Sequence, residues 1–246
     1  MKTIIGNWKM NLSLKESVDL ARALAKKSFN AEVVICPTFT ALAEVKKALG
    51  KSAIGLGAQN VHFENAGAFT GEVSPKQLKE VGCTHVIIGH SERRAMKEET
   101  YVSINKKIIA AMSSGITPII CVGETKEDRK SGKARAVVVD QVKGALHDLH
   151  TRAREALLFA YEPVWAIGGG VAATPADVVA MHMLIRSTIE TAVYGIKTKQ
   201  IRVLYGGSID EKNAERFLSE REVDGLLVGG ASLKLGSFSA IIGSAQ

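Results

Sequence analysis

Residues 117–124 read Thr-Pro-Ile-Ile-Cys-Val-Gly-Glu, a short apolar run at 117–122 followed by a glycine and a carboxylate. The run is continuous rather than alternating, which is typical of a parallel strand buried on both faces. Runs of the same kind recur along the chain at 3–9, 32–36, 54–59, 85–89, 157–161, 201–205 and 224–228. The pattern therefore predicts eight parallel strands.

Longer segments with helical spacing separate these runs, at 14–27, 75–81, 101–113, 133–150, 175–194 and 211–219. Thr174 before Pro175 is typical of a helix start, and Gly115 and Gly195 are typical of helix ends. Eight strand–helix units in 246 residues predict an α/β protein with a closed (β/α)₈ barrel. No linker divides the chain, so we expect one domain spanning residues 1–246. An open doubly wound sheet is the alternative, but no Gly-x-Gly-x-x-Gly motif opens a helix.

Composition excludes several classes of protein. Lys and Arg number 32 against 25 Asp and Glu, but the basic residues are scattered and only 5% of the chain is aromatic, which disfavours a nucleic-acid-binding surface. No apolar run is long enough to span a membrane, and the start lacks a secretory leader, so we expect a cytoplasmic protein. Cys36, Cys83 and Cys121 are expected to be buried and reduced. His147 and His150 have no clustered third ligand, so neither a metal nor a cofactor is expected.

Polar residues gather where the predicted strands end. Asn7 and Lys9 close the first strand, His90 follows the fourth and Glu162 follows the sixth. The carboxyl ends of barrel strands meet at one face, so these side chains are expected to converge there. A carboxylate, an imidazole and an ammonium together suit proton abstraction next to a carbonyl, with Glu162 as the base.

Glycine clusters follow the last three strands, at 168–170, 206–208 and 229–230. Backbone N–H groups of glycine can approach an anion closely, and a short helix near Ala231 would point at the same place. Any one cluster is explained by a tight turn, but three that converge predict a phosphate site.

Seven stretches resemble the triosephosphate isomerase family, in the family's order and at its spacings. They are 6–11 (Gly-Asn-Trp-Lys-Met-Asn), 67–74 (Gly-Ala-Phe-Thr-Gly-Glu-Val-Ser), 89–94 (Gly-His-Ser-Glu-Arg-Arg), 121–124 (Cys-Val-Gly-Glu), 160–168 (Ala-Tyr-Glu-Pro-Val-Trp-Ala-Ile-Gly), 204–208 (Leu-Tyr-Gly-Gly-Ser) and 227–232 (Leu-Val-Gly-Gly-Ala-Ser). The resemblance covers essentially the whole chain. It implies a TIM barrel that interconverts dihydroxyacetone phosphate and D-glyceraldehyde 3-phosphate without a cofactor, in glycolysis and gluconeogenesis.

The resemblance also implies roles for individual residues. Glu162 would be the base, His90 a neutral electrophile, Lys9 and Asn7 electrostatic partners, and Glu92 a residue that orients Lys9. The phosphate would be held by Asn7, Lys9, Gly168, Ser208, Gly229 and Gly230. A lid would comprise Pro163, Val164, Trp165, Ala166, Ile167, Gly168, Gly169, Gly170 and Val171.

A homodimer is implied as well, in which a loop containing Phe69, Thr70, Gly71 and Glu72 inserts into the second subunit. The sequence departs from the family at two places. Residues 168–173 read Gly-Gly-Gly-Val-Ala-Ala at the end of the lid, and residues 95–99 lack the usual aromatics. The second departure predicts a dimer that dissociates more readily than is usual in the family.

Two other functions stay open at this stage. A retaining glycosidase would use two carboxylates, such as Glu92 and Glu162, although the chain is poor in aromatics that stack on sugars. A non-catalytic barrel that binds sugar phosphates is the second, but it would leave the base, imidazole and lysine without a role.

Overall fold

The computed structural model describes residues 1–97, 99–149, 157–167 and 173–245. The described strands form a closed parallel barrel in which each pairs with its neighbours in chain order, and the last pairs with the first through Thr3 and Gly225. They are β1 (Thr3–Asn7), β2 (Glu32–Cys36), β3 (Gly55–Ala58), β4 (His85–Ile88), β5 (Thr117–Val122), β6 (Leu157–Tyr161), β7 (Ile201–Tyr205) and β8 (Gly225–Val228). The predicted (β/α)₈ barrel is confirmed.

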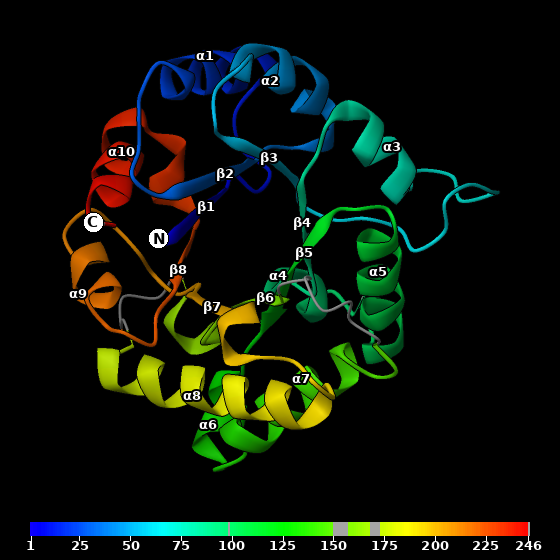
Figure 1. Cartoon of the computed structure of the whole chain (residues 1–246), viewed down its shortest axis with the longest axis vertical. Helices are drawn as coiled ribbons and strands as arrows, with labels where there is room; N and C mark the ends of the chain where they lie inside the picture. Colours follow the sequence, from blue (N-terminus) through cyan, green and yellow to red (C-terminus); the bar gives the residue numbers. More distant parts are fainter. Residues whose placement is uncertain (98, 150–156, 168–172, 246) are drawn as a thin grey trace.

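Helices surround the strands, as Figure 1 shows. They are α1 (Leu14–Ala25), α2 (Leu42–Leu49), α3 (Pro75–Val81), α4 (Ser91–Ala95), α5 (Tyr101–Ser113), α6 (Lys126–Lys130), α7 (Ala134–Ala145), α8 (Pro175–Ala192), α9 (Ala214–Leu218) and α10 (Leu235–Gly243). Short 3₁₀ helices lie at Phe39–Ala41 (η1), Val164–Ala166 (η2), Thr198–Gln200 (η3) and Gly230–Leu233 (η4). The last lies where the sequence predicted a short helix near Ala231.

Hydrogen bonds explain where the helices begin and end. At α8 the Thr174 hydroxyl accepts from the Asp177 N–H and the Asp177 carboxylate accepts from the Thr174 N–H, which confirms the predicted start. At α7 the predicted helix 133–150 is too long, because the helix ends at Ala145. There the Asn105 amide donates to the carbonyls of Ala145 and His147 and caps the last turn.

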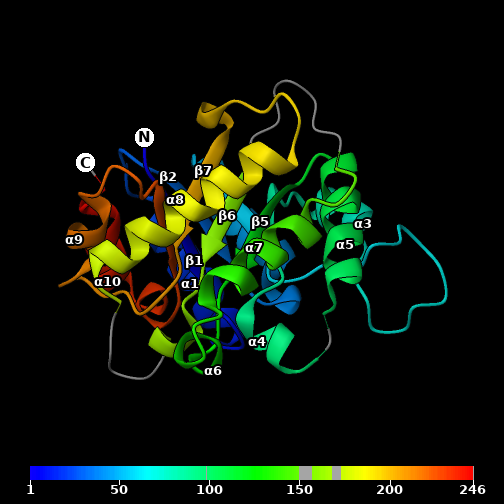
Figure 2. The same ribbon diagram turned by 90° about the horizontal axis from the view of Figure 1, so that it is seen from below.

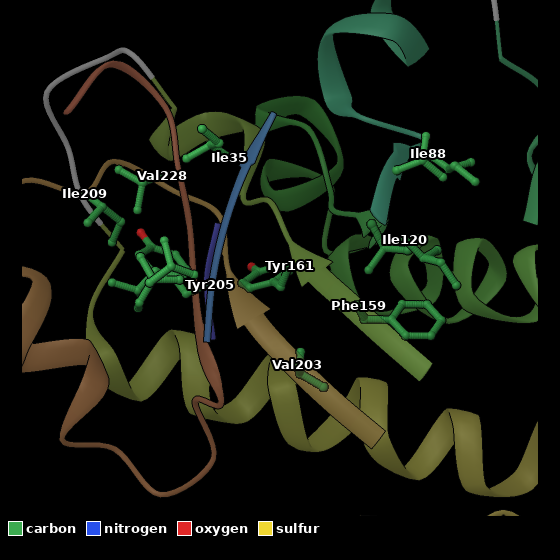
Figure 3. Close-up of a cluster of buried hydrophobic side chains, with 14 of the residues drawn as sticks. Ile35, Ile88, Ile120, Phe159, Tyr161, Val203, Tyr205, Ile209 and Val228 are labelled. Atoms are coloured by element: carbon green, nitrogen blue, oxygen red, sulfur yellow. The ribbon is translucent and has the colours of Figure 1, made fainter. Parts of the chain in front are cut away.

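The hydrophobic core has two layers. The barrel interior is filled by Ile5, Val34, Cys36, Ile87, Ile119, Cys121, Leu158, Ala160, Leu204 and Leu227. A larger layer lies between the strands and the surrounding helices, and Figure 3 shows part of it, with Ile120, Phe159 and Val203 from neighbouring strands. Apolar residues that alternate between the two layers explain why each strand reads as a continuous apolar run.

The three cysteines are buried and free, as predicted. In the part of the chain that the structure describes, no helix is long and apolar enough to cross a membrane. The same residues contain no group of His, Cys, Asp and Glu that could hold a metal ion.

Candidate active site

Four of the five predicted catalytic residues meet in one cavity of about 290 Å³ at the carboxyl ends of the strands, and Glu92 does not line it. Its walls come from the ends of β1, β4, β6, β7 and β8. The lining residues are Asn7, Lys9, His90, Glu162, Ile167, Gly206, Gly207, Ser208, Ile209, Leu227, Gly229, Gly230 and Ala231. The structure thus brings Asn7, Lys9, His90 and Glu162 together with the predicted phosphate residues Ser208, Gly229 and Gly230.

Glu162 is held at the end of β6 by its backbone. Its N–H donates to the Val122 carbonyl at 2.8 Å, and Pro163 restricts the chain that follows. The residue that follows β5 must be glycine, because a Cβ on Gly123 would lie 1.7 Å from the Glu162 carbonyl oxygen. Glu162 therefore has a fixed backbone position, set by the contact between the ends of β5 and β6.

The Glu162 carboxylate is buried and fully engaged. Oε1 lies 3.0 Å from His90 Nε2, and Oε2 accepts from the Ser91 N–H at 2.9 Å. Burial raises the pKa of this carboxyl, but His90, the Ser91 N–H and Lys9 outweigh burial and hold its pKa below the ordinary value. Glu162 is therefore ionised at neutral pH, as a base must be.

His90 follows β4, and its two ring nitrogens have different partners. Nδ1 accepts from the Glu92 N–H at 3.3 Å, so the proton of the neutral ring lies on Nε2, which faces Glu162. Burial lowers the pKa of His90, whereas the Glu162 carboxylate raises it, and the net direction in this arrangement is upward. Cys121 lies beneath as a thiol, because burial and Glu162 raise its pKa well above the usual value.

Lys9 lies beyond the strand rather than in it, since β1 ends at Asn7. Its backbone has a φ of +51°, in the left-handed region that a non-glycine residue rarely adopts. The Lys9 N–H donates to Asn7 Oδ1 at 3.0 Å, and its carbonyl accepts from Gln59 Nε2 at 2.8 Å. Its ammonium lies 2.6 Å from Glu92 Oε1, so Glu92 contacts Lys9 as expected.

One wall of the cavity is built from small residues. A Cβ on Gly229 would lie 3.5 Å from Lys9 Cε, and one on Gly230 would meet nothing within 4 Å. Gly206 and Gly207 precede Ser208 in the same wall. This wall exposes backbone to a ligand and faces the Lys9 side chain, an arrangement suited to an anion.

Comparison with known proteins agrees with this geometry. The model of the triosephosphate isomerase family matches residues 2–245. The chain belongs to the triosephosphate isomerase family. Among its relatives, the triosephosphate isomerase of Herpetosiphon aurantiacus is 44% identical over 97% of both chains. That of Dictyoglomus thermophilum is 46% identical over 99% of both, and that of Carboxydothermus hydrogenoformans is 47% identical over 97% of this chain and 96% of its own.

The family resemblance also implies a lid and a dimer loop. Of the lid, Pro163–Ile167 is described and Ile167 lines the cavity, whereas Gly168, Gly169, Gly170 and Val171 lie outside the described residues. The loop with Phe69, Thr70, Gly71 and Glu72 extends from the body between β3 and α3, in cyan in Figures 1 and 2. Phe69 there contacts the ring of His62 in a tilted arrangement, with ring centroids 4.4 Å apart.

Three supporting residues of the triosephosphate isomerase site were not predicted. Gln59 fixes the Lys9 carbonyl, Gly123 admits the Glu162 backbone, and Glu124 bonds to Trp165. Each of them lies just after a strand, and this position is the feature of the sequence that could have identified them. Their contacts are with residues 50, 39 and 41 positions away, and no local pattern carries that information.

Proposed function

We propose that this protein interconverts dihydroxyacetone phosphate and D-glyceraldehyde 3-phosphate, with Glu162 as the base, in the glycolytic and gluconeogenic direction alike. The observation that carries the proposal is the buried Glu162 carboxylate beside the His90 imidazole, in a cavity whose glycine-rich wall suits a phosphate. Membership in the triosephosphate isomerase family supports the same substrate.

The substrate phosphate would occupy the part of the cavity wall formed by Ser208, Gly229 and Gly230. The Lys9 side chain lies against Gly229 in that wall, so its ammonium can attract the dianion. This orientation presents the carbonyl and the neighbouring carbon to His90 and Glu162. Gly168, the remaining phosphate residue of the proposal, lies outside the described residues.

The reaction transfers one proton between adjacent carbons. Glu162 takes the proton from the carbon next to the carbonyl, and the C–H electron pair forms the C–C double bond of an enediolate. The negative charge that develops on oxygen is stabilised by the His90 Nε2–H and by Lys9 and Asn7. His90 gives its Nε2 proton to that oxygen and takes the proton of the neighbouring hydroxyl in its place. Protonated Glu162 then returns its proton to the other carbon, and the oxygen that lost its proton becomes the product carbonyl.

Binding must first rearrange the contacts of Glu162, because His90 and Ser91 occupy its two oxygens in the empty site. A substrate oxygen that takes the His90 Nε2–H frees Oε1 and removes the partner that lowers the pKa of Glu162. The carboxylate thereby becomes a stronger base. At the same time His90 loses the carboxylate that favours its protonation, so the ring acts as a neutral donor.

Water would be excluded by apolar residues of the cavity. Ile167 and Leu227 line it beside the polar groups. We propose that the segment from Pro163 to Ile167 covers this side of the reacting centre and so strengthens the interactions with the enediolate.

The alternatives are less well supported. Glu92 pairs with Lys9 and does not line the cavity of Glu162, so the two carboxylates do not flank one bond as a glycosidase requires. A non-catalytic barrel needs no ionised base beside an imidazole. A coupled assay with D-glyceraldehyde 3-phosphate tests the proposal: rapid formation of dihydroxyacetone phosphate supports it, and tight phosphoglycolate binding without turnover would leave only the binding function.

We further propose a homodimer. A second cavity of about 300 Å³ shares Asn7, Lys9 and His90 with the first and includes Phe39, Arg93 and Met96. The loop around Phe69 and Thr70 extends from the body as a complementary element (Figure 2), and Phe69 is 43% exposed. In the dimer, Thr70 of the partner subunit would lie beside Asn7 and Lys9.

The predicted weakness of this dimer follows from the second cavity. Met96 there is flexible and takes the place of an aromatic, although Arg93 still binds the buried Glu99 behind it at 3.0 Å. Sedimentation and activity at falling concentration test the dimer. The fraction of dimer and the specific activity should fall together as the protein is diluted. A monomer at every concentration would contradict the proposal, and so would a dimer that persists into the low-nanomolar range, which corresponds to a free energy of association of about −12 kcal/mol.

A further inference from the structure

One guanidinium joins three segments beside the catalytic base. Arg129 on α6 has its NH2 nitrogen 2.6 Å from Asp177 Oδ1, in the first turn of α8. Its NH1 nitrogen lies 3.4 Å from Glu124 Oε1, which follows β5. The guanidinium carbon lies 4.3 Å from the ring centroid of Trp165, three residues after Glu162.

Glu124 is the centre of this cluster. Its Oε1 accepts from Trp165 Nε1 at 2.8 Å and from the Tyr161 hydroxyl at 3.1 Å, and its carbonyl accepts from the Val164 N–H at 3.1 Å. The side chain is completely buried, and among the described residues no partner is found for its second oxygen. The charge of Arg129 is therefore needed to keep this carboxylate in place.

Asp177 is itself fixed before it reaches Arg129. Its Oδ2 accepts from the Thr174 hydroxyl at 2.6 Å and from the Thr174 N–H at 3.2 Å, which leaves Oδ1 directed at the guanidinium. The Thr174 hydroxyl and Arg129 hold the pKa of Asp177 below its usual value, so the carboxylate is charged. The helix cap thus orients an anion toward Arg129.

We propose that Asp177 is a positioning residue for the reaction of Glu162. It holds Arg129 over Trp165 and against Glu124, and these contacts fix the turn at Val164–Ala166 that follows the base. The inference rests on the proposed isomerase function, because it assigns Asp177 an effect on that chemistry. Asp177 contacts neither the cavity nor Glu162 and acts only through Arg129 and Trp165.

The first test compares kcat and KM of Asp177→Asn with the wild type. Asparagine keeps an oxygen that can accept from Thr174 but loses the charge toward Arg129. The pair is about one-third exposed, so we expect kcat to fall by about two- to fivefold with KM nearly unchanged. Asp177→Glu should restore most of the lost kcat.

Two further variants separate positioning from helix stability. Glu16→Gln alters the corresponding acid in the cap of α1, where Glu16 binds Ser13, and should leave kcat unchanged. Arg129→Met should lower kcat by at least about tenfold, since it leaves Glu124 uncompensated. Adding Asp177→Asn to Arg129→Met should cause no further loss, because the aspartate acts through the arginine.

Acrylamide quenching of tryptophan fluorescence supplies a readout that does not depend on turnover. Trp8 is fully buried, so an increase in quenching in Asp177→Asn reports a less restrained Trp165. The proposal would be overturned if Asp177→Asn changed neither kcat nor quenching. It would also be overturned if Asp177→Asn lowered kcat by the same factor in the wild type and in the Arg129→Met variant. A wild-type protein without isomerase activity would overturn the proposed function and the catalytic part of this inference, while quenching would still show whether Asp177 restrains Trp165.

Discussion

Replacing Gly123 by alanine should move Glu162, the proposed base, without altering any reacting group. A Cβ at residue 123 would lie 1.7 Å from the Glu162 carbonyl oxygen and 2.6 Å from its carbonyl carbon. A normal contact between carbon and oxygen needs about 3.3 Å, so the two backbones must separate by roughly 1.5 Å. The Glu162 N–H bond to Val122, at 2.8 Å, would be lost or lengthened in the process.

The expected effect on catalysis follows from that displacement. A misplacement of about 1 Å at a catalytic group can cost about 10²-fold in rate, so kcat of Gly123→Ala should fall by at least about 10²-fold. Overpacking should also lower the free energy of unfolding by about 1–3 kcal/mol. Steady-state kinetics and urea unfolding would measure the two effects on the same preparation.

Gly236→Ala is the matched control. Gly236 lies in α10, and a Cβ there meets nothing within 4 Å, so kcat should be unchanged and stability should rise by about 0.5–1 kcal/mol. A folded Gly123→Ala protein with kcat within a few-fold of the wild type would refute the reasoning. It would show that β5 does not fix the position of Glu162.

Three other changes test separate parts of the site and the core. Glu162→Gln removes the proton acceptor while keeping its shape, so kcat should fall at least about 10²-fold with phosphoglycolate affinity largely kept; activity within a few-fold of the wild type would exclude Glu162 as the base. Lys9→Met should lower kcat/KM by more than about 10²-fold, and unchanged phosphoglycolate binding would place Lys9 outside the site. Burial lowers the pKa of His182 from 6.5 to about 3. As pH decreases, His182 therefore takes up a proton in the unfolded chain before it does so in the folded protein. The free energy of unfolding should fall as pH decreases below about 6.5, by about 2 kcal/mol at pH 5. His182→Asn should remove this part of the pH dependence in urea unfolding, and an unaltered slope would assign it to other groups.

The fold could be predicted because its dominant signal is local. Each strand is a continuous apolar run, and the outcome matches the predicted residues 32–36, 117–122, 157–161 and 201–205 without change. The first strand was predicted to end at Lys9, two residues too late. The strand ends at Asn7, and Lys9 has a left-handed backbone that a strand does not contain. That conformation depends on Asn7 and Gln59, and Gln59 comes from another strand end.

Short helices were harder to predict than strands. Helices α2, α6 and α10 were missed, and they contain only 8, 5 and 9 residues. Such short segments show too few turns for a clear apolar period. Buried side chains stabilise α2 and α10 instead, and a cap formed by Thr125 and Asp128 begins α6. The residues that line the cavity were easier to predict than these short helices, because the carboxyl ends of the strands converge in any closed barrel.

The empty cavity also indicates how binding energy would act in the proposed reaction. Each charged group that lines it already has a partner: Lys9 binds Glu92, and Glu162 binds His90. A substrate must therefore exchange these contacts rather than meet free charges. The Lys9–Glu92 pair is partly exposed and is easily exchanged, whereas the Glu162–His90 pair is buried. In the proposed reaction, separating the buried pair would oppose binding but produce a stronger base and a neutral donor. The interactions gained with the enediolate would then exceed those with the bound substrate, and this difference, rather than tight substrate binding, would accelerate the proton transfer.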